Sequence, residues 1–277
     1  MRLQFFAPVT GILFAAMPLM AQQQPGQPSQ PQSQQGSSHQ QPQAQQQGPR
    51  PKSQQEMEAL QKVKTALQAH NPDAEIQAVN NVLENFTDTD YKPVLLNIGM
   101  QAAAQKGDYA QTLVWGDRII QNNPNDVQAR VVMAEDIAQH TRENDLDKEQ
   151  SLKKVDDYAN KVLDVLKTAD TPPAGFPAEK WTAYKNELSG QAYDALGLAA
   201  GLRKKFPDAV GNFKEAVNKD PNPVSTAHLA KAYVDNKQYD DAITTADKVL
   251  AMNEAPPSVK QFAEQQKAAA AKLKTTK

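Results

Sequence analysis

The chain has 277 residues, of which 39% are hydrophobic and 22% charged, and its formal net charge is −2. This balance is typical of a soluble protein and does not provide the concentrated basic face that nucleic-acid binding needs, so we expect no nucleic-acid partner. The absence of cysteine excludes disulfides, thiolate zinc sites, iron–sulfur clusters and a cysteine nucleophile.

Residues 1–21 have the form of a secretory signal peptide. Arg2 precedes an apolar run at 5–20, and Ala21 supplies a small residue at the cleavage point. The alternative is an uncleaved anchor, although the run is short for the roughly 20 residues of a spanning helix and contains prolines. The sequence therefore predicts an exported protein, periplasmic or in the cell envelope of a bacterium. A membrane contact is expected only if this segment is retained.

Residues 22–52 form a Gln/Pro-rich segment with almost no apolar side chains. Such a composition buries too little surface to offset the entropy of ordering the chain, so the segment is predicted to be a disordered linker. We interpret it as a spacer. The alternatives are a ligand for a proline-binding domain and an aggregation-prone glutamine tract.

A helical body is expected to begin at Ser53. Ser53 to Glu56 has the form of a capping box, and a stripe of apolar residues at helical spacing follows it. Asn71 and Pro72 read as the N-cap and first residue of a second helix. These two helices make the first predicted hairpin.

The second predicted unit, 93–126, carries a spacing that recurs later in the chain. Its residues step by three, four, three and five positions: Tyr109, Thr112, Gly116, Ile119 and Pro124. Small residues in the middle of this pattern let two helices approach closely, and the proline ends the second helix. The turn between the helices is expected at Gly107.

The third hairpin is less regular. Its two apolar helical stripes are separated by a charged stretch at 142–149, which indicates a solvated insertion. The proline-rich stretch 171–177 then breaks the chain. A helix that begins near Ala178 is predicted to be longer than one repeat needs.

Two further units are predicted at 190–223 and 223–256, followed by a capping helix at 257–274. The spacing of the second unit recurs in the first of these, beginning at Phe206, and again 33 positions later, beginning at Tyr239. A fixed period near 34 predicts stacked helix–turn–helix units, of which we expect four or five. Gly197 and Gly201 lie on an apolar helix face and are interpreted as packing glycines.

This register resembles the tetratricopeptide repeat over most of residues 53–277. The matching positions are Tyr193, Leu196, Gly197, Ala200, Phe206, Ala209, Phe213, Ala216 and Pro221. The first hairpin departs from the pattern because Glu75 stands where a small residue is expected. The resemblance implies an all-α solenoid of stacked antiparallel hairpins that binds a protein or peptide in a concave groove.

No constellation of catalytic or metal-binding residues is apparent. The four histidines, His39, His70, His140 and His228, are scattered, and neither a metal-ligand spacing nor a glycine-rich phosphate loop occurs. We therefore expect no catalytic, cofactor-binding or metal site, no cofactor and no enzymatic activity.

The resemblance places a candidate peptide groove on the last two units. Its residues would include Asp194, Leu198, Leu202, His228, Lys231 and Val234. Each of these could instead pack in the interior or be solvated. The hypothesis is a non-enzymatic scaffold that binds a protein or peptide partner of unknown identity. The alternative is a structural or assembly subunit tethered by an uncleaved N-terminus and the low-complexity segment.

Overall fold

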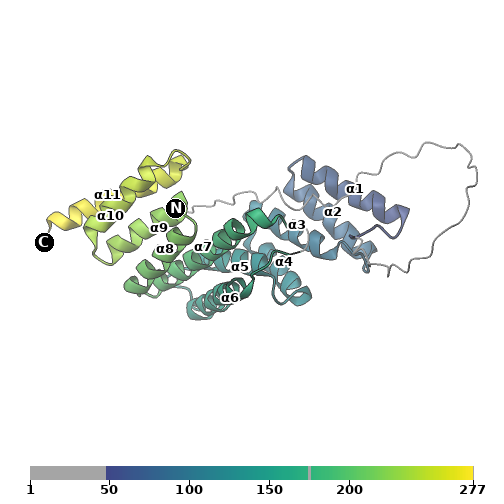
Figure 1. Ribbon diagram of the computed structural model, residues 1–277, viewed down its shortest axis with the longest axis horizontal. Helices are drawn as coiled ribbons and strands as arrows, with labels where there is room; N and C mark the ends of the chain where they lie inside the picture. Colours follow the sequence, from purple (N-terminus) through teal and green to yellow (C-terminus); the bar gives the residue numbers. More distant parts are fainter. Residues whose placement is uncertain (1–47, 174–175, 277) are drawn as a thin grey trace, which may run out of the picture.

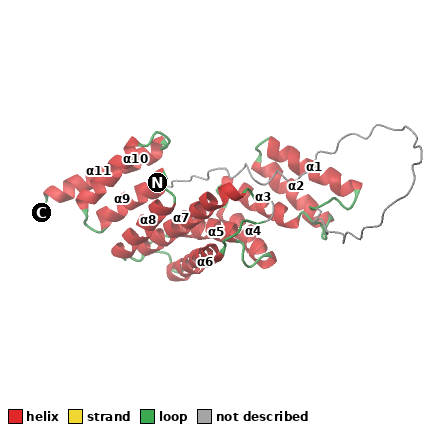
Figure 2. Cartoon of the chain, viewed as in Figure 1, coloured by secondary structure: helices red, strands yellow, loops and turns green. Residues whose placement is uncertain are grey.

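The computed structural model describes residues 48–173 and 176–276, and within these ranges every regular element is an α-helix (Figure 2). The predicted signal peptide and most of the predicted linker lie outside the described residues. The helices are α1 (Gln54–Gln68), α2 (Pro72–Asn85), α3 (Lys92–Gln105), α4 (Tyr109–Asn122), α5 (Val127–His140), α6 (Lys148–Thr168), α7 (Ala178–Leu202), α8 (Phe206–Lys219), α9 (Pro223–Asp235), α10 (Tyr239–Ala251) and α11 (Pro257–Thr275).

The helices pack in successive pairs to form an elongated array, with α1 and α2 at one end and α11 at the other (Figure 1). Each helix contacts the next one in the chain, and in the C-terminal part of the array the first helices of neighbouring pairs also touch: α5 contacts α7, α7 contacts α9, and α9 contacts α11. This pairing confirms the predicted α-solenoid of helix hairpins. Five pairs and the terminal helix α11 are present among the described residues.

The turns inside four of the five pairs share one backbone geometry. Each contains a residue with positive φ, namely His70 (48°), Gly107 (67°), Lys204 (61°) and Lys237 (62°). At the α7–α8 turn the Lys204 N–H donates to the Gly201 carbonyl and the next N–H donates to the Ala200 carbonyl, both at 2.9 Å. These bonds define a Schellman motif, which satisfies the last carbonyls of a helix. The predicted turn at Gly107 is confirmed.

The α5–α6 pair has a different connection. Residues 141–147 replace the short turn, and none of them has positive φ. Leu146 at the tip of this loop is fully exposed. Arg203, in the α7–α8 turn, forms ion pairs with Glu149 (3.0 Å) and Asp156 (2.9 Å) of α6. The predicted insertion is therefore present, and the start of α6 that follows it is held against the next hairpin.

Close approach between helices explains most of the buried glycines. A Cβ atom on Gly197 would lie 2.6 Å from the Phe213 ring, and one on Gly99 would lie 2.8 Å from the Trp115 ring. Real Cβ atoms do not approach other atoms so closely, so these positions require glycine. Gly197 is a packing residue, as predicted. The same interpretation is wrong for Gly201, around which no atom lies within 4 Å of a Cβ position.

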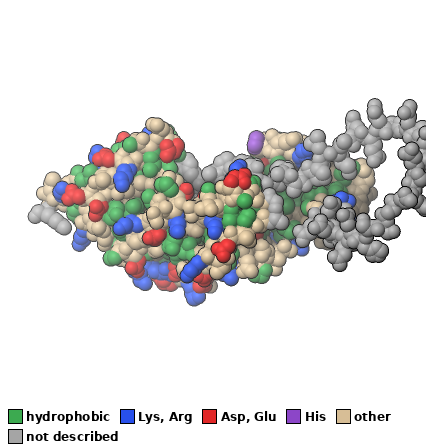
Figure 3. Space-filling view, viewed as in Figure 1, with side chains coloured by type: hydrophobic (Ala, Val, Ile, Leu, Met, Phe, Trp, Pro, Cys, Tyr) green, Lys and Arg blue, Asp and Glu red, His purple; other side chains and the backbone are tan. Residues whose placement is uncertain are grey.

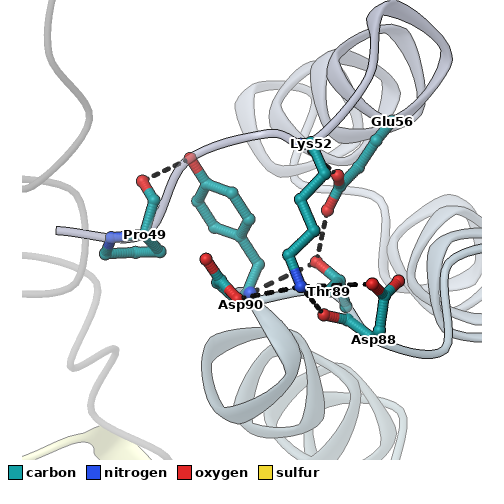
Figure 4. A network of polar contacts seen from close by, with 7 residues as sticks. Pro49, Lys52, Glu56, Asp88, Thr89 and Asp90 are labelled. Carbon is teal, nitrogen blue, oxygen red and sulfur yellow. Dashed lines mark hydrogen bonds and ion pairs between the residues drawn. The ribbon is translucent and has the colours of Figure 1, made fainter.

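A buried polar network fixes the start of the array (Figure 4). Glu56, which is 1% exposed, accepts a hydrogen bond from the Thr89 hydroxyl at 2.6 Å and from the Lys52 N–H at 2.5 Å. Tyr91 donates its hydroxyl proton to the Pro49 carbonyl at 2.9 Å. Residues 49–52, which composition assigned to the linker, are therefore held against the loop between α2 and α3.

The N-terminal caps of α1 and α2 follow their predicted residues with one difference. The Ser53 hydroxyl accepts from the Glu56 N–H at 3.0 Å, and Asn71 accepts from the Ala74 N–H at 3.2 Å. In a capping box the glutamate would accept from the Ser53 N–H. Here Glu56 instead accepts from the N–H of Lys52, because its carboxylate is drawn toward the Thr89 hydroxyl.

The surface of the array mixes charges of both signs. Figure 3 shows acidic and basic side chains interspersed over the described part of the visible face. No helix in that part of the chain is long and apolar enough to span a lipid bilayer.

Candidate peptide-binding site

A cavity of about 380 Å³ opens between α7, α8 and α9. The C-terminal turns of α7 form one wall, and α9 forms the opposite wall. Its apolar surface comes from Leu198 and Leu202 of α7 and from Phe206 and Phe213 of α8. This volume is near the lower end of the roughly 300–1,000 Å³ range of ligand pockets in proteins.

Gly201 makes the cavity accessible. It lies on the same face of α7 as Leu198, and a Cβ built at this position meets no atom within 4 Å. Any larger residue at 201 would extend into the open space of the cavity instead of the core. The glycine that the sequence suggested was needed for packing is therefore a lining residue of the pocket.

A buried ion pair lies in the wall of the pocket. Nδ1 of His228, on α9, is 2.9 Å from Oδ2 of Asp194, which is on α7 and 5% exposed. The His228 ring also lies 5.5 Å from the Phe213 ring. Burial disfavours the charged imidazole, but the Asp194 carboxylate outweighs this effect, so the pKa of His228 is raised. The pair orients His228 toward the pocket and joins α7 to α9.

Charged residues form the rim of the pocket. Lys231 and Asp235, one turn apart on α9, form an ion pair at 2.5 Å. Lys204 pairs with Glu143 of the 141–147 insertion, and this contact lowers the pKa of Glu143. Since exposed ion pairs contribute little to stability, these four side chains remain free to exchange partners when a ligand arrives.

Four of the six predicted groove residues line the pocket: Leu198, Leu202, His228 and Lys231. Asp194 lies behind His228 as its ion-pair partner. Val234 is half-buried and does not line the pocket, whereas its neighbour Asp235 does.

The sequence did not predict several of the residues that line the pocket. Phe206 and Phe213 were read only as packing residues, although each also lines the cavity. Gly201 was assigned to packing. Glu143 lies in the loop of the preceding hairpin, and the only sequence signal for its role was its position in a charged insertion.

A group of acidic residues lies on α5 and α7, two helices that contact each other. It consists of Glu135 on α5 and of Glu187 and Asp194 on α7. Burial raises the pKa of Glu135 well above its usual value, and the carboxylates of Asp194, Asp136 and Glu187 raise it further. Burial also raises the pKa of Glu187. Among the described residues, the charged groups that shift the pKa of Glu135 are all acidic.

The other two described histidines have roles in packing and in a turn. The His140 ring stacks on Tyr109 with centroids 4.4 Å apart, and its Nδ1 lies 2.8 Å from the Asp136 carbonyl at the end of α5. His70 occupies the left-handed position of the first turn. Within residues 48–173 and 176–276, no three potential metal ligands come together.

No protein family's sequence profile matches the chain, and no curated protein matches it. Its helices superpose loosely on solved helical-repeat structures. A tetratricopeptide-repeat protein of Thermus thermophilus has a TM-score of 0.47 and 18% identity, with 77% of this chain and 98% of that chain covered. MamA of Desulfovibrio magneticus has a TM-score of 0.45 and 18% identity, with 77% of this chain and 98% of that chain covered.

The tetratricopeptide domain pair of yeast Sti1, solved with an HSP90 peptide, has a TM-score of 0.28 and 19% identity, with 78% of this chain and 98% of that chain covered. The assignment of the fold rests on features of this chain: the successive helix pairs, the repeated Schellman turn and the glycine–aromatic contacts between helices. These features describe a tetratricopeptide-like solenoid, as the sequence register predicted.

Proposed function

We propose that this protein is a non-enzymatic scaffold that binds a segment of another protein in the pocket between α7, α8 and α9. One observation carries the proposal: at Gly201 an otherwise packed helix pair leaves an apolar cavity open, with a charged rim around it. An apolar pocket with a few polar groups at its edge is suited to a side-chain anchor from a partner.

We further propose that the scaffold works outside the cytoplasm, in the cell envelope. This proposal rests on the signal-like residues 1–21. The polar network at 49–56 supports a role for the preceding segment as a spacer, because it fixes the point where that segment meets the folded array.

Site-specific photocrosslinking tests the binding proposal. Lys231, an exposed residue at the pocket rim, is replaced with p-benzoyl-phenylalanine in the full-length protein, and Lys248, which is exposed on α10 and does not line the pocket, serves as the matched control. We expect position 231 to crosslink a discrete partner protein, identified by mass spectrometry, and position 248 not to do so. The same products from both positions, or no product from position 231, would refute the proposal.

A further inference from the structure

A second cavity lies toward the N-terminal end of the array, apart from the pocket between α7, α8 and α9 (Figure 1). Its volume is about 340 Å³, and it opens between α2, α3 and α4. Leu83 of α2 and Leu96 of α3 supply its apolar wall, and the other residues that line it are polar or basic. The proposed function makes no use of this cavity.

The charged residues that line the second cavity are both basic. Lys92 begins α3 and Arg118 lies on α4, so the two cations come from different helices. Within residues 48–173 and 176–276, neither of these side chains forms an ion pair or a hydrogen bond. The Arg118 guanidinium carbon lies 5.0 Å from the centroid of the Trp115 ring. This cation–π contact holds the group in place without neutralising its charge.

Acidic residues that adjoin the cavity in the sequence do not neutralise it. Asp88 and Asp90 both pair with Lys52, at 3.3 and 3.2 Å, and Figure 4 shows their carboxylates turned toward that lysine. Asp117 precedes Arg118 on α4, but consecutive helix residues point in different directions, and Asp117 does not line the cavity. The cavity therefore has an excess of positive charge and is suited to an anion.

We propose that this cavity binds a small organic phosphate, with the phosphate group between Lys92 and Arg118. A guanidinium group binds two oxygens of a phosphate at once, and the lysine adds a second positive charge. The organic part would contact the apolar wall formed by Leu83 and Leu96. A volume of about 340 Å³ falls in the roughly 300–1,000 Å³ range of ligand pockets, so it has room for an organic group beside the phosphate.

The polar lining favours a phosphate over a carboxylate. Thr87, Gln121 and Asn122 also line the cavity, and each can donate a hydrogen bond through a hydroxyl or an amide group. A phosphate monoester carries close to two negative charges and three acceptor oxygens, whereas a carboxylate has one charge and two oxygens. Two cations and three further donors therefore match the phosphate better.

Isothermal titration calorimetry on the full-length protein at low ionic strength tests this proposal. The probes are phenyl phosphate, benzoate, inorganic phosphate and benzyl alcohol. We expect phenyl phosphate to bind one site per chain about tenfold or more tightly than benzyl alcohol, as for a charge-assisted hydrogen bond. Benzoate and inorganic phosphate should both bind more weakly than phenyl phosphate, because each lacks part of the matching chemistry.

Three variants assign the binding to the cavity. The double variant Lys92→Gln/Arg118→Gln should weaken the binding of phenyl phosphate about tenfold or more, whereas Lys214→Gln/Lys219→Gln, which removes the same charge from exposed positions on α8, should not. Gln121→Glu keeps both cations and adds a carboxylate to the lining, so it should also weaken binding.

Equal binding of phenyl phosphate and benzyl alcohol, or no binding of any probe, would overturn the proposal. Equal losses in the two double variants would also overturn it. Tighter binding of benzoate would contradict the phosphate, and tighter or equal binding of inorganic phosphate would contradict an organic ligand. None of these results affects the proposed function, because the two cavities share no lining residue.

Discussion

The α7–α8 pair and the α5–α6 pair show two ways of joining neighbouring helices in this array. In α7–α8 a short Schellman turn ends the first helix, and Gly197 lets the Phe213 ring pack against it. In α5–α6 the longer segment 141–147 takes the place of that turn. The second pair shares a buried apolar core, as the first does, and its loop and the start of α6 are additionally tied to the neighbouring turn by ion pairs with Arg203 and Lys204.

The largest expected loss of stability comes from a substitution between α7 and α8, the pair with the Schellman turn. Gly197→Ala would place a methyl group 2.6 Å from the Phe213 ring, which has no flexible end to move away. Overpacking of this kind costs about 2 kcal/mol in free energy of unfolding. Gly211→Ala, the same change in open space on α8, should instead stabilise by up to about 1 kcal/mol through helix propensity. Urea unfolding of both variants measures the difference, and equal effects would contradict the packing account.

The contribution of the ion pairs between Arg203 and α6 can be tested by substituting Arg203. Its side chain is largely buried and contacts two carboxylates of α6, so Arg203→Ala should lower the free energy of unfolding by about 1 kcal/mol, reduced by the exposure of Glu149. Lys153→Ala is the control, because the Lys153–Asp157 pair is exposed on both sides. Hydrogen exchange of α6 should quicken only in the Arg203 variant. Equal exchange in both variants would show that this contact does not hold the pair.

The backbone geometry shared by the four short turns can be tested at Lys237. This residue has φ of 62°, which is unfavourable for a side chain with a Cβ and costs nothing for glycine. Lys237→Gly should therefore stabilise the protein by about 0.5 kcal/mol, and Gly107→Ala should destabilise it by a similar or larger amount. Thermal unfolding of the two variants checks the opposite signs, and shifts of the same sign would contradict the turn assignment.

The effect of replacing Glu135 on the free energy of unfolding is expected to depend on pH. Its folded-state pKa is raised above the ordinary value, so its contribution to stability is complete below the ordinary pKa and is lost as pH rises through the folded-state value. Glu135→Gln should match the wild type in free energy of unfolding at acid pH and exceed it at neutral pH. Urea unfolding across this range provides the test. A constant difference at all pH values would contradict it.

Much of the array could be predicted because its determinants are local. Ser53 and Asn71 cap their helices through bonds to residues three positions on, and Gly107 lies in a turn closed by its own neighbours. The period also correctly predicted Gly197 as a close-contact position. These features depend on short stretches of sequence.

The site was predictable only in part because it joins distant residues. The Asp194–His228 pair spans 34 positions, and Glu143 reaches the rim from another hairpin. Gly201 and Gly197 look alike in the sequence, but only the packing of α8 and α9 shows that one is filled and the other open. Composition likewise assigned residues 49–52 to the linker, because it could not show that Tyr91 of the α2–α3 loop donates a hydrogen bond to the backbone at 49.

The most direct test of a scaffold that binds in this pocket is hydrogen exchange of the full-length protein, alone and with the partner captured by crosslinking. We expect slower exchange in the C-terminal half of α7 and in α9, with no change in α2 or α4. Protection confined to other helices, or none at all, would contradict the assignment of this pocket as the binding site.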